Sequence, residues 1–541
     1  MAQKRFGVQN IAAEWAYVSE KAYKDPFNDV ELDVEFTDEA GGLWRIPAFW
    51  AGGNEWRIRF APPHSGKYEY RTICPDRDNS SLDNLTGQLE AAAYEGDNKL
   101  FKHGPVRAGS SHYFEHEDHT PFFWLGDTWW FAACNRISWP DDFQYLASER
   151  KKLGFTVVQM FAGMHPDTGN FDARSKNEAG FSWEEGYARI NPAYYDLLDL
   201  KIQWLVRTGI VPCIYGSQGY YYMWMGPETL KKHWRNLIAR YGAYPVIWCL
   251  AGETTNPYYM IEDSEERDRN HYIQKKGWTE TGRYVHDIDP YKRMVTSHPM
   301  PFTDGRDDLE DTSVIDFDLL QCGHGGYKDM PAIVDFIQSA VGRSPGMPVV
   351  NGEVNYEGLL GRNWEDLQRF QFWSSWLSGT AGFTYGADGI MQANAPGNLF
   401  GPSPYGTSWG NTVWQEACRF KGAAQVCAGK RLLERYEWWR FKPQPELIKS
   451  IPEYDAFTKP YCAGIPGEIC ILYFHEALMR NSPATFIKGL KSGTSYTAFF
   501  MDPRNGQEYP LDDVCAGAGG EWKIPLPPIM IDWVLVLERK K

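Results

Sequence analysis

The pattern of apolar and polar residues divides the chain into three parts. In residues 1–105, stretches such as Val30–Phe36 and Glu55–Phe60 alternate apolar with polar side chains, which is typical of half-buried strands. Short strands return near the C-terminus, for example Ile469–Phe474, and turns rich in glycine and proline separate them. We therefore predict a β-sandwich over residues 1–105 and a second, smaller β-sandwich over residues 431–541.

At residues 106–430 the pattern changes to continuous apolar strands that alternate with amphipathic helices. Strands of a parallel sheet have such continuous apolar sequences, because helices cover both of its faces. The predicted strands are Phe122–Gly126, Thr156–Phe161, Ile210–Tyr215, Val246–Leu250, Met294–Ser297, Phe317–Gln321, Pro348–Asn351 and Gly382–Tyr385. The predicted helices are Asp141–Leu153, Pro192–Arg207, Pro227–Tyr241, Glu265–Ile288, Met330–Ala340 and Trp364–Leu377.

Eight strand–helix units in a segment of this length predict a (β/α)8 barrel. The expected fold is therefore α/β, a TIM barrel flanked by N-terminal and C-terminal β-sandwich domains. An open doubly wound sheet is the alternative arrangement of the same elements, and its first strand commonly leads into a GxGxxG turn. No such turn follows Phe122–Gly126, so the barrel is favoured.

Two of the predicted barrel strands end in a glutamate. Glu253 follows the fourth strand, in YPVIWCLAGETT, and Glu353 follows the seventh, in MPVVNGEVNYEG. Active sites of TIM barrels lie at the C-terminal strand ends, where units three apart can face each other across the mouth. Glycosidic bond cleavage needs two opposed carboxyl groups, one to protonate the leaving oxygen and one to attack or to activate water. We therefore predict that Glu253 and Glu353 are catalytic, with Glu357 as the alternative nucleophile.

Several motifs resemble a known family. Leu125-Gly-Asp-Thr-Trp-Trp and Gly154-Phe-Thr-Val-Val-Gln resemble the barrel of apiosidase-like glycosidases, which is a clan A type of glycoside hydrolase. The segment from Arg57 to Tyr68, RIRFAPPHSGKY, resembles the DUF5060-like sandwich that is often fused to that barrel. The resemblance implies a retaining glycoside hydrolase that acts on plant-derived oligosaccharides, with Glu253 as acid/base and Glu353 as nucleophile.

Two positions differ from the pattern of that resemblance. Gly252 stands where many clan members have asparagine, and Glu253 stands where apiosidases have aspartate. The identity of the sugar therefore stays open between furanosides, such as apiose or arabinose, and pyranosides, such as galactose, glucose or xylose.

Other polar and aromatic residues at strand ends are candidates for sugar binding. Carboxylates and imidazoles bind sugar hydroxyls, and aromatic rings stack on sugar faces. The candidates are Asp127, Trp129, Trp130, His165, Tyr215, His298, His324, Tyr356 and Tyr385. For Asp127, the alternative is a helix or turn cap. The histidines come from separate units and form no HxH or HExxH pair, so we expect neither a metal nor another cofactor.

Composition narrows the list of partners. The net charge is −15 without any lysine- or arginine-rich run, which disfavours binding to nucleic acid or to an anionic membrane. The ten cysteines form no CxxC pair and are interpreted as buried free thiols. The N-terminal sequence lacks the apolar core of a secretory signal, so we expect a cytoplasmic enzyme that trims imported oligosaccharides by exo action. Its size and acidity are compatible with a homo-oligomer.

Two other classes of protein fit parts of the same pattern. A non-catalytic carbohydrate-binding protein could use the same barrel and sandwiches, but it would not require both strand-end glutamates. A metal-dependent hydrolase could use the strand-end histidines, and activity in EDTA would exclude it.

Overall fold

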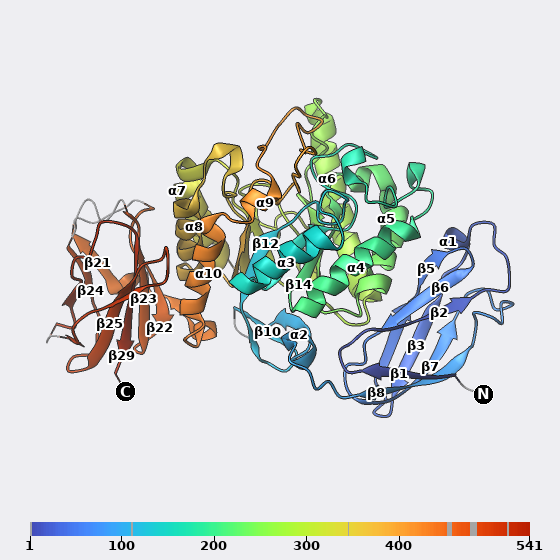
Figure 1. Cartoon of the computed structure of the whole chain (residues 1–541), viewed down its shortest axis with the longest axis horizontal. Helices are drawn as coiled ribbons and strands as arrows, with labels where there is room; N and C mark the ends of the chain where they lie inside the picture. The colour runs from blue at the N-terminus through green and yellow to red at the C-terminus, as the bar shows by residue number, and fades with distance from the viewer. Residues whose placement is uncertain are drawn as a thin grey trace.

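The computed structural model shows three parts in a row, with the barrel between two β-sandwiches (Figure 1). The two chain ends lie on the outer sandwiches, on opposite sides of the barrel. The structure describes residues 3–109, 112–343, 346–451, 457–476, 484–516 and 519–540.

The central part is one parallel sheet of eight strands in the order β16-β15-β14-β13-β12-β19-β18-β17. Its strands are β12 (Trp124–Thr128), β13 (Val157–Phe161), β14 (Val211–Gln218), β15 (Ile247–Gly252), β16 (Val295–Thr296), β17 (Asp318–Gln321), β18 (Val349–Glu353) and β19 (Gly382–Tyr385). The hydroxyl of Thr296 in β16 donates to the carbonyl of Phe317, the residue just before β17, at 2.8 Å, and this bond joins the two ends of the sheet. The predicted TIM barrel with flanking sandwiches is confirmed.

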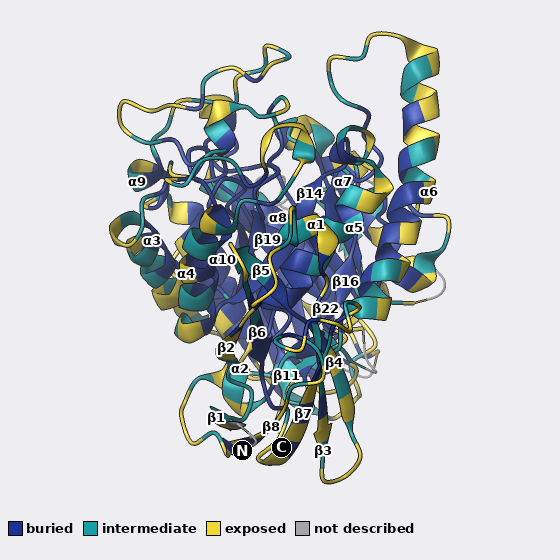
Figure 2. Cartoon of the chain, turned by 90° about the vertical axis from the view of Figure 1, so that its right-hand side faces the viewer, coloured by how far each residue is buried: buried dark blue, intermediate teal, exposed yellow. Residues whose placement is uncertain are grey.

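Helices cover the outer face of this sheet. They are α3 (Asp141–Leu153), α4 (Pro192–Thr208), α5 (Tyr221–Tyr241), α6 (Ser264–Ile288), α7 (Met330–Gly342), α8 (Glu365–Leu377), α9 (Trp414–Ala417) and α10 (Lys421–Leu433). Local sequence sets their ends: α4 begins at Pro192 and stops at Gly209, whose φ of 79° suits glycine. Figure 2 shows buried residues in the barrel strands and exposed ones on the outward faces of α3, α4 and α6.

Several strand ends differ from their predicted positions. β15 and β18 each continue two residues beyond the predicted end, to Gly252 and Glu353. β12 begins at Trp124 because Pro121–Phe122 (β11) pairs instead with β10 (Phe114–His116), which also pairs with β9 (Val106–Ala108). β14 continues three residues beyond the predicted end, and all its residues are buried. Its last residue, Gln218, thereby reaches the mouth of the barrel.

The N-terminal sandwich packs a five-stranded sheet, β1-β8-β7-β3-β4, against a three-stranded one, β2-β6-β5. Phe36 and Phe60 stack between the sheets at 3.9 Å between ring centroids. Arg59 joins this sandwich to the barrel: its guanidinium pairs with Asp199 of α4 and donates to the carbonyl of Arg240 of α5 at 2.7 Å. The elements are β1 (Gln3–Val8), β2 (Ala13–Val18), α1 (Pro26–Asp29), β3 (Asp33–Asp38), β4 (Leu43–Pro47), β5 (Phe49–Gly52), β6 (Glu55–Phe60), β7 (Gly66–Ile73), β8 (Thr86–Ala92) and α2 (Lys99–Lys102).

The C-terminal sandwich is built in the same way from a sheet in the order β20-β22-β23-β29-β25-β26, with β27 beside β25, and a second sheet, β21-β24-β28. A buried ion pair of 2.7 Å between Arg369 of α8 and Asp532 joins it to the barrel. Its strands are β20 (Lys442–Pro443), β21 (Ile448–Ile451), β22 (Tyr461–Ile465), β23 (Ile469–Phe474), β24 (Ala484–Ile487), β25 (Ser495–Met501), β26 (Glu508–Pro510), β27 (Val514–Cys515), β28 (Trp522–Lys523) and β29 (Trp533–Arg539).

Two further expectations concern cysteines and membranes. All ten cysteines are free, and nine of them are buried as predicted, whereas Cys515 is exposed. Within the described ranges, no helix is both long enough and apolar enough to span a bilayer.

Candidate active site

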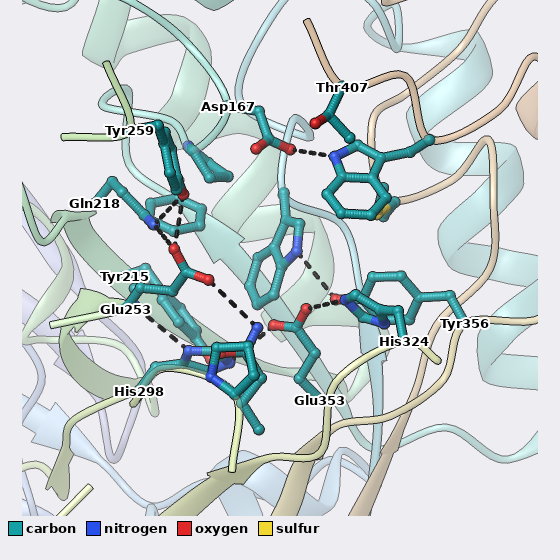
Figure 3. Close-up of a pocket in the computed structure, with 18 of the residues that line it drawn as sticks. Asp167, Tyr215, Gln218, Glu253, Tyr259, His298, His324, Glu353, Tyr356 and Thr407 are labelled. Atoms are coloured by element: carbon teal, nitrogen blue, oxygen red, sulfur yellow. Dashed lines mark hydrogen bonds and ion pairs between the residues drawn. The ribbon is translucent and has the colours of Figure 1, made fainter. Parts of the chain in front are cut away.

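A cavity of about 270 Å³ lies at the C-terminal ends of the barrel strands. Both predicted catalytic glutamates line it, and their carboxyl groups point into it from opposite sides (Figure 3). Of the nine predicted sugar-binding residues, the lining includes Trp130, Tyr215, His298, His324 and Tyr356.

Glu353 is the last residue of β18, and two histidines hold its carboxylate. Nε2 of His324 lies 2.9 Å from Oε1, and Nε2 of His298 lies 3.0 Å from Oε2. Nδ1 of His298 faces the backbone N–H of Glu253 at 3.5 Å, which leaves the Nε2 proton to face Glu353. Burial by itself raises the pKa of Glu353, but the two histidine hydrogen bonds outweigh it and hold this pKa well below its usual range. Glu353 is therefore ionised.

Glu253 is the first residue after β15 and is held by neutral donors. Its Oε2 accepts hydrogen bonds from Gln218 Nε2 at 3.0 Å, Asn256 Nδ2 at 2.8 Å and the Tyr259 hydroxyl at 2.7 Å. These bonds orient the carboxyl group, and Oε1 lies 3.5 Å from Nε2 of Gln321. Sequence analysis missed Asn256 and Tyr259, although both lie within six residues of the glutamate in the turn that follows it.

Each glutamate is preceded by a glycine that close packing requires. A Cβ at Gly252 would lie 2.5 Å from both Phe161 Cζ and Gln218 Oε1, and a Cβ at Gly352 would lie 2.4 Å from Leu319 Cγ. Contacts this short do not occur in folded proteins, because interiors are already packed at crystal density. Many clan members have asparagine at position 252, and the glycine here has a physical reason. Gln218 occupies the space beside Glu253 that a side chain at position 252 would need.

Aromatic residues form much of the remaining wall. The indole N–H of Trp130 donates to the Tyr356 hydroxyl at 3.1 Å, and its ring lies 4.9 Å from that of Tyr215. Burial, and then the charge on Glu353, raises the pKa of Tyr356. The phenol therefore stays protonated beside the ionised glutamate.

Four of the predicted sugar-binding residues lie outside the cavity lining. Asp127 and Tyr385 are paired neighbours on β12 and β19, and their side chains face the helix layer. The Asp127 carboxylate pairs with Arg150 of α3 at 2.6 Å, accepts from the Trp129 indole at 2.7 Å and is fully buried. The Arg150 guanidinium also lies over the Tyr385 ring, 5.5 Å from its centroid. Asp127, Trp129 and Tyr385 therefore support the barrel wall instead of reaching the expected position at the substrate.

His165 and the alternative nucleophile Glu357 are also outside the lining. The His165 ring stacks on Phe131 at 4.7 Å, and burial lowers the pKa of His165 to about 3. Glu357 accepts hydrogen bonds from the Tyr385 hydroxyl at 2.5 Å and from the backbone N–H of Gly422 at 3.0 Å. Burial raises its pKa to about 7. Glu357 lies four residues beyond Glu353, the last residue of β18, and this explains why its side chain is outside the cavity lining.

Residues from two long loops complete the cavity, and sequence analysis did not identify them. Asp167 comes from the loop after β13, whereas Tyr405, Thr407 and Trp409 come from residues 386–413, which we call the strand-eight loop. No periodic pattern marks these positions. Within the described part of the chain, no cluster of three or more His, Cys, Asp or Glu side chains is arranged to hold a metal ion.

Comparison with known proteins agrees with this architecture. Residues 109–440 match the family model described as "Apiosidase-like, catalytic domain", and residues 4–75 match a domain of unknown function, DUF5060. The resemblance to both families is thus confirmed. No curated protein matches the chain.

Two solved structures show the same fold. A putative glycoside hydrolase from Bacteroides vulgatus ATCC 8482 aligns with 99% of this chain and 100% of its own, at a TM-score of 0.70 and 16% identity. A glycoside hydrolase family 5 protein from the same organism aligns with 82% of this chain and 95% of its own, at a TM-score of 0.67 and 19% identity.

The position of Asp127 predicts a structural effect of its removal. Asp127→Ala leaves the Arg150 guanidinium buried without its partner, so the free energy of unfolding should fall by about 3–5 kcal/mol while KM is unchanged. Denaturant unfolding of variant and wild type measures this loss. Glu149→Gln is the control, because Glu149 pairs with Lys152 on the exposed side of the same helix and should cost about 1 kcal/mol or less. A raised KM at unchanged stability would restore Asp127 to the sugar site.

The packing at Gly252 predicts a catalytic defect. Gly252→Ala should push Gln218 off Glu253 and lower kcat/KM about tenfold or more, because the carboxyl group loses one of the hydrogen bonds that orient it. Gly342→Ala is the control, because nothing lies within 4 Å of a Cβ there. Steady-state kinetics of both variants distinguish the loss of the Gln218–Glu253 hydrogen bond from a general effect of replacing glycine by alanine. Equal kcat/KM in the two variants would contradict the prediction.

Proposed function

The chain belongs to the apiosidase-like catalytic-domain family and is a glycosidase, and we propose that it is a retaining glycoside hydrolase that removes terminal sugars from plant-derived oligosaccharides. One observation carries this proposal: two glutamates point into the same small cavity, and their carboxyl groups are held in different ways. Histidines keep Glu353 ionised, whereas the hydrogen bonds to the Glu253 carboxyl group come, among the described residues, from neutral amide and hydroxyl donors.

This difference assigns the roles in a double displacement. The Glu353 carboxylate attacks the anomeric carbon, and the bond from that carbon to the leaving oxygen breaks as Glu253 gives that oxygen its proton. A glycosyl ester on Glu353 results. Glu253, now ionised, takes a proton from water, whose oxygen attacks the anomeric carbon and releases Glu353. The sugar leaves with the configuration it had in the substrate.

The small volume of the cavity supports exo action. Its volume of about 270 Å³ is just below the range of about 300–1,000 Å³ that is typical of small-molecule pockets. A cavity of this size suits a terminal sugar better than an internal stretch of a polysaccharide. Aromatic walls from Trp130, Tyr215 and Trp409 suit the apolar faces of a sugar ring.

The roles of the glutamates are tested on a panel of aryl furanosides and pyranosides. Glu353→Gln should lower kcat by at least about 10³-fold on whichever sugar the wild type hydrolyses, because the nucleophile is lost. Glu253→Gln should lose activity on substrates with poor leaving groups. On dinitrophenyl glycosides, whose leaving oxygen needs no proton, it should keep much of its kcat/KM, whereas kcat should fall because Glu253 no longer takes a proton from water in the second step. Glu357→Gln is the matched control, since this buried glutamate lies outside the cavity lining.

The stereochemical outcome tests retention separately. Proton NMR of the first product formed should show the anomer of the substrate. The opposite anomer would establish inversion, and equal activity of Glu353→Gln and wild type would remove Glu353 as nucleophile. If a sugar bound but no glycoside in the panel were hydrolysed, the alternative of a non-catalytic carbohydrate-binding protein would be favoured.

A further inference from the structure

A third carboxyl group, Asp167, joins two loops that are far apart in the sequence. It lies after β13 with a φ of 55°, an uncommon backbone conformation for a residue other than glycine. Its carboxylate accepts hydrogen bonds from the Tyr405 hydroxyl and from the Trp409 indole N–H, the latter at 3.0 Å. Figure 3 shows Asp167 across the cavity from Glu253 and Glu353. Two side chains of the strand-eight loop are thus held at the cavity by one carboxylate.

The two rings that Asp167 holds lead to the two catalytic glutamates. The Tyr405 ring lies 4.4 Å from the ring of Tyr259, whose hydroxyl donates to Glu253 at 2.7 Å. The Trp409 ring lies 5.8 Å, edge to face, from the ring of His324. His324 in turn contacts Glu353 at 2.9 Å. Each glutamate is therefore separated from Asp167 by one aromatic ring and one hydrogen-bonding side chain.

The outer part of the strand-eight loop has separate attachments. Arg174 Nη1 donates to the carbonyl of Pro402 at 2.7 Å, and Arg136 Nη2 donates to the carbonyl of Asn398 at 2.6 Å. These bonds fix the loop backbone at residues 398 and 402, whereas the Tyr405 hydroxyl and the Trp409 indole N–H bond to Asp167.

We propose that Asp167 is a positioning residue that draws the strand-eight loop over the bound sugar and, through Tyr405 and Trp409, holds the partners of both glutamates in place. The inference rests on the proposed hydrolase function, whose site it completes. Asp167 acts through its two aromatic partners, so its removal should weaken substrate binding more than it slows the chemical step.

The charge of Asp167 makes this arrangement sensitive to pH. Burial raises the pKa of Asp167 to about 6. The charges on Glu253 and Glu353 also raise this pKa, whereas the hydrogen bonds from Tyr405 and Trp409 lower it. The ionised carboxylate accepts both bonds, whereas the protonated form has to donate one proton and loses one acceptor position. The titratable and charged groups that face Asp167 are Tyr405 on the strand-eight loop, Glu253 and Tyr259 after β15, Glu353 on β18, Tyr220 before α5 and Arg174 on its own loop.

The proposal is tested by steady-state kinetics on the aryl glycoside that the wild type hydrolyses. Asp167→Asn should raise KM about tenfold and lower kcat less, because one charged hydrogen bond to the loop is lost. The wild-type KM should rise as the pH falls below about 6, and this rise should be absent in Asp167→Asn. Asp289→Asn is the matched control: Asp289 is a buried aspartate that accepts from the Trp248 indole at 2.9 Å and lies outside the cavity lining.

A double-mutant cycle tests whether Asp167 acts through its partners. In a Tyr405→Phe, Trp409→Phe background, Asp167→Asn should add little to KM. A full additional effect there would overturn the positioning role and make Asp167 a direct substrate contact.

Limited proteolysis provides a readout that needs no activity. Chymotrypsin should cut the strand-eight loop, at Leu399, Phe400, Tyr405 or Trp409, several-fold faster in Asp167→Asn than in wild type or Asp289→Asn. Mass spectrometry locates the cuts. Unchanged cleavage together with unchanged KM would overturn the inference and leave the hydrolase proposal standing. An active Glu353→Gln variant would instead remove Glu353 as the nucleophile and leave the role of Asp167 standing.

Discussion

Several carboxyl groups share one small cavity, and the need to hold their charges apart shapes the structure around them. Like charges at close range destabilise one another unless opposite charges or hydrogen-bond donors compensate. At Glu353 the compensation comes from two histidines, which keep the carboxylate ionised. The Glu253 carboxyl group instead has neutral partners, an asparagine, a glutamine and a tyrosine. The two groups therefore differ in electrostatic setting, and a double displacement needs such a difference.

The barrel makes this arrangement possible because its strands deliver these groups to one place. Glu253, Glu353 and their histidine partners come from the ends of neighbouring or opposite strands, and none of these side chains has to cross a long loop to reach the cavity. The glycine before each glutamate lets adjacent strands and their side chains approach closely at that level. Rigid strand ends thus carry the two glutamates of the proposed mechanism, whereas loops carry the residues that close the cavity.

A second layer of polar side chains lies behind the cavity. The Asp127–Arg150 pair ties β12 to α3, and the Tyr385–Glu357 hydrogen bond ties β19 to the loop after β18, where Glu357 also accepts from Gly422 of α10. Unpaired charges in such a dry layer would be costly, so each of these carboxyl groups has a donor or a guanidinium beside it. These residues look like site residues in the sequence because they occur at strand ends, as true site residues do.

The sequence by itself determined the order of strands and helices, the TIM barrel with its sandwiches, and the two glutamates at strand ends. Those features depend on local patterns, such as continuous apolar runs and a Gly-Glu pair after them, which can be recognised without knowing any neighbour. Tertiary structure alone decided which strand-end residues face the cavity. The side-chain direction alternates along a strand, so Asp127 and Tyr385 face Arg150 of the helix layer, whereas Trp130 lies in the turn after β12 and lines the cavity. It also decided the contribution of the loops: Asp167 and Tyr405 are 238 residues apart, and only the closed barrel brings their side chains into contact.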